Sequence, residues 1–176
     1  KYNLANGLEV ILYQNKFIPF VSVNLWYKVG SSNEVIGKTG LAHLFEHMMF
    51  QGSKNVPREM HFRYIQEAGG TLNASTSFDR TNYFEKLPSN DLELALWLES
   101  DRMFGLDFSQ KNLDTQKSVV VEEFNQRYLN QPYGDAILKL RPLAYKVHPY
   151  RWPSIGMDIN HVAGVDLENV KEFFFS

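Results

Sequence analysis

The sequence contains no cysteine, and this absence narrows the chemistry open to the chain. Without a thiol there is no disulfide, no thiolate metal ligand and no cysteine nucleophile. The absence leaves the compartment undetermined, because a cysteine-free chain is compatible with the cytoplasm and with an oxidising bacterial periplasm. Any metal site in this chain must therefore be built from histidine, aspartate and glutamate side chains.

Long apolar runs and an excess charge of one sign are also lacking. No run approaches the roughly 20 apolar residues that a membrane-spanning helix needs, so we expect no membrane span. Lys and Arg number 18 and Asp and Glu number 20, which gives a formal net charge of −2. Nucleic-acid binding needs a basic excess or patch, and the sparse cluster of Lys139, Arg141 and Lys146 is better interpreted as a solvated helix face. We therefore expect no nucleic-acid partner.

The 176 residues, 44% of them hydrophobic, suffice for one domain with a sizeable core. Alternating apolar and polar residues predict a strand over 21–29, and segments rich in Thr and aromatics predict strands over 71–78 and 81–87. Asn6-Gly7 predicts a hairpin with a two-residue type I′ turn. Helices are expected over 39–51, 58–68, 90–104 (with a capping box at Asn90), 109–129, 135–146 and 167–175. This mixed order predicts an α+β fold, with a mostly antiparallel sheet packed against several helices.

The most informative segment is His43-Leu44-Phe45-Glu46-His47. In a helix, residues four apart lie on one face, so both imidazoles can reach one small cation, with Glu46 on the same side. The surrounding helix is apolar nearly all round and is expected to be buried, where histidines need partners. The H-x-x-E-H order matches an inverted zinc-peptidase motif. The alternative is that both histidines are solvated on a helix surface. For His61, on the next predicted helix, we expect such an exposed position.

A catalytic zinc ion takes three protein ligands and leaves one position for water. The pair Glu122 and Glu123 directly follows three β-branched apolar residues, which predicts that one carboxylate turns inward and needs a partner. The sequence alone does not decide which of the two does so. The alternatives are a solvated pair, or an ion pair between Glu123 and Arg127 four residues later.

Five segments, in this order, resemble the pitrilysin family of zinc peptidases, which includes insulin-degrading enzyme, the mitochondrial processing peptidase and many bacterial zinc proteases. They are Gly40 to Met48, Gly69 to Thr76 with Asp79 and Tyr83, Ser100 to Met103, Val119 to Glu123, and His148 to Tyr150 with Ile155-Gly156. The resemblance covers nearly the whole chain. It implies the N-terminal, zinc-binding half of a bacterial-type member, with the α+β fold of one such half.

The resemblance also implies roles for the metal-site residues. His43 and His47 would be zinc ligands and Glu46 the general base. The third ligand would be Glu123, which lies 76 positions after His47, as the third ligand does in the family. Gln116 stands where the family often has a glutamate, and it is a candidate to orient a neighbouring group by a hydrogen bond.

For substrate binding, the resemblance implies an edge strand that pairs with an extended peptide through Asn73 and Ala74. The small side chains of Ala74 and Ser75 favour close approach of another backbone. The alternative is a plain hairpin without a ligand.

The activity implied is that of a zinc-dependent endopeptidase. Zinc would activate a water molecule, and Glu46 would take its proton and pass it to the leaving amine. The substrate would be a peptide or an unfolded polypeptide. We interpret 1–176 as a single zinc-binding peptidase domain that stops before its last strand. We therefore expect a second homologous half, on the same chain or in a partner subunit, and weak or no activity without it. The alternatives are a non-catalytic scaffold or partner subunit of the same family, and a zinc hydrolase of non-peptide substrates.

Overall fold

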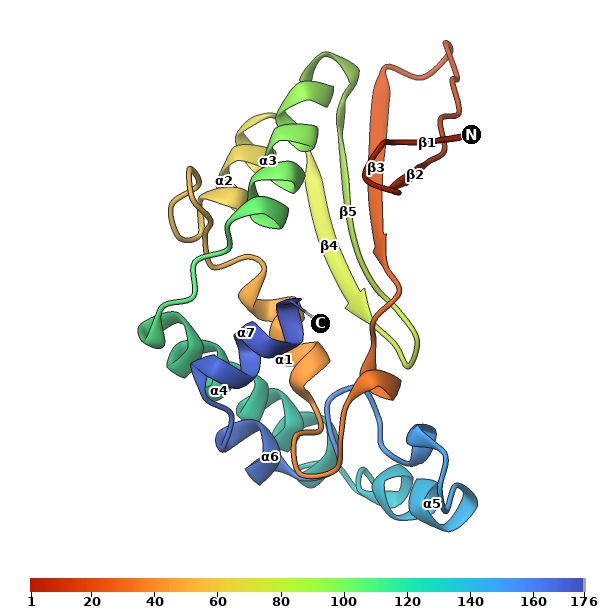
Figure 1. Cartoon of the computed structure of the whole chain (residues 1–176), viewed down its shortest axis with the longest axis vertical. Coiled ribbons are helices and arrows are strands. Elements are labelled where there is room, and N and C mark those ends of the chain that lie inside the picture. Colours follow the sequence, from red (N-terminus) through yellow and green to blue (C-terminus); the bar gives the residue numbers. More distant parts are fainter. Residues whose placement is uncertain (176) are drawn as a thin grey trace.

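The computed structural model describes residues 1–175, and an antiparallel sheet forms its upper part in Figure 1. β5 (Thr81–Pro88) is the central strand, paired with β3 (Phe20–Tyr27) on one side and with β4 (Thr71–Thr76) on the other. Exposure alternates along β3, as its pattern of apolar and polar residues predicted. β4 is an edge strand of this sheet, so among the described residues one of its sides has no partner strand.

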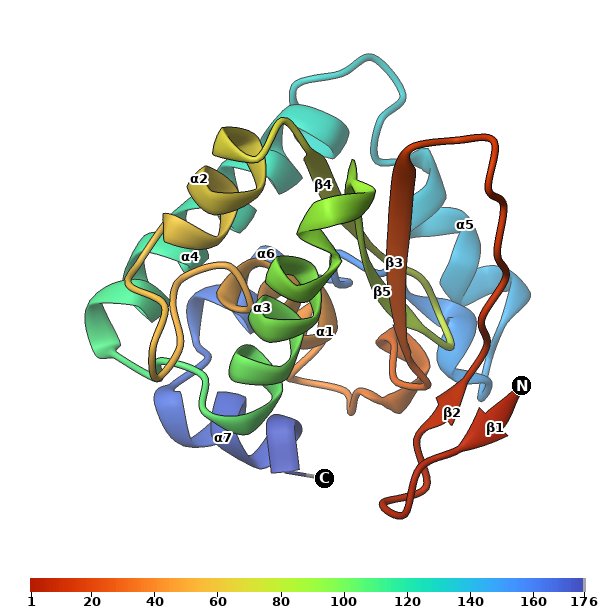
Figure 2. The same ribbon diagram turned by 90° about the horizontal axis from the view of Figure 1, so that it is seen from above.

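A small hairpin precedes the sheet and consists of β1 (Tyr2–Asn3) and β2 (Glu9–Val10). It lies beyond β3, on the side away from α2 and α3 (Figures 1 and 2). The predicted two-residue turn is wrong. The N–H of Leu4 donates to the carbonyl of Leu8 and the N–H of Gly7 to the carbonyl of Leu4, and Gly7 has a φ of 89°. These bonds enclose three residues ending in a left-handed glycine, which is a type I turn with a bulge.

Seven α-helices form in the described part of the chain, and none of them is both long and apolar enough to cross a bilayer. Figure 1 shows α2 and α3 beside the upper part of the sheet, with α1, α4, α6 and α7 gathered below. The helices are α1 (Leu41–Met48), α2 (Met60–Glu67), α3 (Leu92–Phe104), α4 (Gln110–Phe124), α5 (Ala136–Ala144), α6 (Ile159–Ala163) and α7 (Leu167–Phe175). The predicted α+β class with an antiparallel sheet is confirmed.

Three local features differ from the prediction. Asn90 does not cap α3, because it lies in a short 3₁₀ turn and no side chain caps that helix. The long helix starts as predicted, with Ser109 accepting from the N–H of Asn112, but α4 ends at Phe124 and a π-helical turn, Asn125–Leu129, continues it. Helix α6 was not predicted, because five residues are too few to establish an apolar period.

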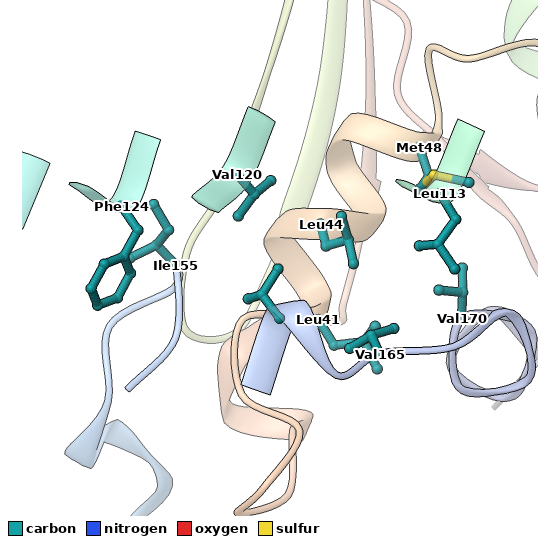
Figure 3. Close-up of a cluster of buried hydrophobic side chains, with 10 residues drawn as sticks. Leu41, Leu44, Met48, Leu113, Val120, Phe124, Ile155, Val165 and Val170 are labelled. Atoms are coloured by element: carbon teal, nitrogen blue, oxygen red, sulfur yellow. The ribbon is translucent and has the colours of Figure 1, made fainter. Parts of the chain in front are cut away.

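Helix α1 is buried because its apolar side meets α4 and the C-terminal segment (Figure 3). Leu44 and Met48 have no exposed surface, and burying side chains of this size contributes about 1.5–3 kcal/mol each. The cluster around them comprises Leu41, Leu113, Val120, Phe124, Ile155, Val162, Val165 and Val170. This packing fixes α1 against α4, and those two helices carry the predicted metal ligands.

Candidate metal centre

The start of α1 is fixed by a carboxylate from outside the helix. Glu34 accepts hydrogen bonds from the backbone N–H groups of Gly40 at 2.9 Å and Ala42 at 2.8 Å; the first N–H groups of a helix have no partner within it. The indole of Trp152 donates to the same carboxylate at 3.0 Å. Burial raises the pKa of Glu34 to about 8, and these donors act in the opposite direction. The sequence did not reveal this cap, because it comes from six residues before Gly40.

Gly40 itself allows the C-terminal segment to approach the helix. Its φ is 89°, and a Cβ at this position would lie 2.5 Å from the carbonyl oxygen of Ile155. A side chain is therefore excluded here by both backbone conformation and space. The start of α1, which lies directly before His43, is thus held from two directions.

The two motif histidines and Glu123 converge on one point. Nε2 of His43 lies 3.7 Å and Nε2 of His47 lies 3.5 Å from Oε2 of Glu123 on α4. A tetrahedral zinc ion about 2.1 Å from each ligand atom would hold those atoms roughly 3.4 Å apart. The spacing of these three side chains therefore fits a single zinc ion.

Glu122 and Glu123 are neighbours on α4, and the turn of the helix points their side chains in different directions. Glu122 is exposed and accepts a hydrogen bond from Gln126 at 3.0 Å. Glu123 is only partly exposed; its Oε2 faces the histidines, and its Oε1 accepts from the guanidinium of Arg127. The ion pair that the sequence offered as an alternative is thus formed, and it leaves the other oxygen of Glu123 available to a metal.

The protonation states also suit a cation. Burial and the neighbouring His47 lower the pKa of His43 to about 4, which keeps this imidazole neutral. The contact with His47 and the positive charge of Arg127 lower the pKa of Glu123, which keeps it ionised. Neutral imidazole and carboxylate are the forms that bind metal.

Gln116 contacts the imidazole of His47 through Nδ1, the ring nitrogen that does not face the proposed metal position. Its Oε1 is 3.3 Å from Nδ1 of His47. An amide oxygen only accepts, so this contact places the imidazole proton on Nδ1 and leaves the lone pair of Nε2 toward Glu123. The position of Gln116 therefore suits the orienting role suggested for it from the sequence.

Glu46 points to the sheet rather than to the histidine Nε2 atoms. Its Oε2 accepts a hydrogen bond from the hydroxyl of Thr76, at the end of β4. Burial raises the pKa of Glu46 above its usual value, and the hydrogen bond from Thr76 opposes this shift only in part. Glu46 lines a cavity of about 260 Å³ beside His47, together with Phe50, Gln51, Phe62, Asn73, Ala74 and Gln116. A carboxylate next to a metal position and facing a cavity is placed to accept a proton from a bound molecule.

Asn73 and Ala74 lie on the edge strand β4 and line this cavity. The Asn73 side chain is exposed, and its Oδ1 accepts from the N–H of Ala74 at 2.8 Å. In this structure the Asn73 amide therefore occupies a donor that a pairing peptide would use.

A second group of potential metal ligands comes from α2, β5 and α3. His61, Glu85 and Glu99 come within 4.8 Å of one another and are all buried. Our expectation that His61 is exposed is wrong, because its Nε2 bonds to Glu85 at 2.7 Å. The guanidinium of Arg102 donates two hydrogen bonds to the carboxylate of Glu99. A fixed positive charge at this distance opposes a cation, so we interpret the group as a structural network.

Comparison with known proteins agrees with the motif. The model of the family described as Insulinase (Peptidase family M16) matches residues 9–144. The "Zinc protease PqqE" of Helicobacter pylori is 36% identical over 97% of this chain, and the match spans 38% of that protein. The chain thus corresponds to less than two fifths of this relative's length.

Two solved structures share the fold. The first half of the periplasmic protease PqqL from Escherichia coli has a TM-score of 0.78 and 26% identity, over 89% of this chain and 34% of that one. A peptidase M16 inactive domain from Pseudomonas fluorescens has a TM-score of 0.87, over 98% of this chain and 42% of that one; at 22% identity this likeness shows the fold alone. From the family match and the sequence identity to a zinc protease, this chain belongs to the insulinase family of peptidases, peptidase family M16.

Proposed function

We propose that this chain is the catalytic half of a zinc-dependent endopeptidase, with His43, His47 and Glu123 as zinc ligands and Glu46 as general base. The observation that carries the proposal is the convergence of both histidine Nε2 atoms on one carboxylate oxygen, at 3.5 and 3.7 Å. Membership in a peptidase family and the name of the Helicobacter pylori relative support it.

A zinc ion, when bound, supplies a Lewis acid that polarises the scissile carbonyl and lowers the pKa of water to about 7. Glu46 takes the proton of the attacking water and delivers it to the leaving amine. Gln116 keeps the His47 ring in the orientation that ligation needs.

The substrate in this proposal is an extended peptide or unfolded polypeptide that pairs with the edge of β4. Edge strands present unpaired backbone groups that can add a further strand. Pairing at Ala74 requires the Asn73 amide to release the Ala74 N–H, which it holds at 2.8 Å. The released amide can then bond to the peptide backbone.

A second homologous half completes the proposed enzyme. The PqqE relative is more than twice as long as the matched region, and a structural neighbour is described as the first half of a protease. In this proposal residues 1–176 form the zinc-binding peptidase domain, and the second half, on the same chain or on a partner subunit, closes over the peptide from the other side.

Metal analysis and two substitutions test the proposal. The wild-type chain should bind one zinc ion, and His47→Ala should lose it. Glu46→Gln should keep zinc but lose peptide cleavage when the second half is present, because an amide cannot accept the proton of water. Glu122→Gln is the matched control, since Glu122 is exposed and bonded to Gln126. Wild-type turnover by Glu46→Gln would refute the base assignment.

The second candidate is a non-catalytic scaffold or partner subunit. A domain described as inactive has the same fold, so the fold by itself does not decide between the two candidates. It predicts no zinc in the purified wild-type chain, and no change in metal content on His47→Ala. The same metal analysis therefore separates the two candidates.

A further inference from the structure

We propose that Thr76 is a positioning residue that fixes the proposed base, Glu46, relative to the substrate strand; the inference rests on the proposed function. The Thr76 hydroxyl donates to Oε2 of Glu46 at 2.5 Å. Among the described residues, Oε1 has no hydrogen-bond partner, so Thr76 holds one carboxylate oxygen and leaves the other for a proton. None of the roles suggested by the sequence includes Thr76.

The direction of this hydrogen bond follows from the neighbouring hydroxyl. Thr81 lies opposite Thr76 in the sheet, with the two hydroxyl oxygens 3.3 Å apart. The Thr81 hydroxyl donates to the carbonyl of Val29 at 3.0 Å. Each hydroxyl has one proton to donate. The Thr81 hydroxyl donates it to the carbonyl of Val29, and the Thr76 hydroxyl donates it to the carboxylate of Glu46. The Thr76 hydroxyl is therefore committed to the carboxylate.

Thr76 also connects the base to the peptide-binding edge. Alternate residues of a strand share one face, which places Thr76 on the same face as Ala74 and Leu72, and both of these pack against the cluster formed by Met49 and Tyr83. The strand proposed to align the peptide thus ends in the side chain that aligns the base. A peptide in register on β4 would meet Glu46 in one orientation.

Two substitutions at Thr76 distinguish positioning from packing. Thr76→Val keeps the shape of the side chain and removes the hydroxyl, whereas Thr76→Ser keeps the hydroxyl and removes the methyl group. A positioning role predicts that the valine variant is impaired and the serine variant is not. A packing role alone predicts the opposite order.

The experiment measures binding of a dipeptide hydroxamate to the zinc-loaded chain by calorimetry. A hydroxamate ligates zinc and gives its proton to an adjacent base, so its affinity reports the placement of Glu46 without requiring turnover. Thr76→Val should weaken binding about tenfold or more, as expected for a lost hydrogen bond to a charged group. Thr76→Ser should stay within about twofold, with zinc content unchanged in both. With the second half present, Thr76→Val should lower kcat and leave KM unchanged.

A Glu46→Gln background supplies the control. If Thr76 acts through Glu46, adding Thr76→Val to Glu46→Gln should cause no further loss of hydroxamate affinity. Equal affinities of wild type, Thr76→Val and Thr76→Ser would overturn the Thr76 proposal and leave the zinc site standing. A wild-type chain that takes up no zinc would instead overturn the proposed function, and the role of Thr76 with it.

Discussion

Replacement of Glu85 by glutamine should change how the stability of this protein depends on pH. Glu85 lies on β5 with 1% of its surface exposed. It contacts His61 of α2, and Glu99 and Arg102 of α3 complete its charged surroundings. Burial raises the pKa of Glu85 from 4.5 to about 7, although Arg102 acts to lower it. Glutamine keeps the size of the side chain and removes its titration.

The sign and size of this change in the free energy of unfolding follow from proton linkage. Between pH 4.5 and about 7 the folded protein holds a proton on Glu85 that the unfolded chain has released. The stability from this proton is therefore complete below pH 4.5 and is lost as the pH rises through 7. Each pH unit amounts to about 1.4 kcal/mol, so the loss in the wild type approaches about 3 kcal/mol. Burial lowers the pKa of His61 to about 3, which gives the opposite slope below pH 6.5. Because that slope opposes the one from Glu85 within each protein, the two proteins are compared at each pH.

Urea unfolding of zinc-free protein at several pH values between 4.5 and 8 measures this difference, and a chelator removes the contribution of metal binding. The stability of Glu85→Gln relative to wild type should rise by about 3 kcal/mol across the interval. The matched control is Glu93→Gln, an exposed carboxylate on α3, which should follow the wild type. Parallel curves for wild type and Glu85→Gln would refute the reasoning.

Two further predictions concern the environment of the metal centre. Glu34→Ala should destabilise the protein by about 3 kcal/mol in urea unfolding, because the N–H groups of Gly40 and Ala42 lose their acceptor, whereas the Trp152 indole keeps the carbonyl of Ser31; a change below about 0.5 kcal/mol would contradict the capping role. Gln116→Ala should weaken zinc binding by about 10- to 100-fold in chelator competition, through the loss of the contact with His47, and an unchanged affinity would show that this contact does not orient the ring.

Local patterns were sufficient for most of the fold. The alternation of residues predicted β3, and the ends of six helices lie within a few residues of their predicted positions, because the apolar period and the capping residues act over short distances. The prediction failed where longer-range contacts decide. Asn90 has the sequence of a helix cap but lies in a 3₁₀ turn. His61 on α2 carries no sequence signal for burial, because its partner Glu85 lies on strand β5.

The candidate metal centre could likewise be predicted only in part from local patterns. The spacing of His43 and His47 on one helix was sufficient to predict a shared face, and the resemblance selected Glu123 on α4. The partners that hold these elements come from distant parts of the chain: Glu34 at the start of α1, and Thr76 at the end of β4. Their roles depend on how the strands and helices pack, so no local pattern identifies them.

Glu123 shows why two interpretations of one residue need not exclude each other. The sequence offered either a metal ligand or an ion pair with Arg127, and a carboxylate has two oxygens that can serve both. Oε1 bonds to Arg127, and Oε2 faces the two histidines. The contact with His47 and the charge of Arg127 both lower the pKa of Glu123, and the ion pair with Arg127 leaves the other oxygen directed at the proposed zinc position. The interaction that first argued against a metal site is therefore part of what makes the site suitable for zinc.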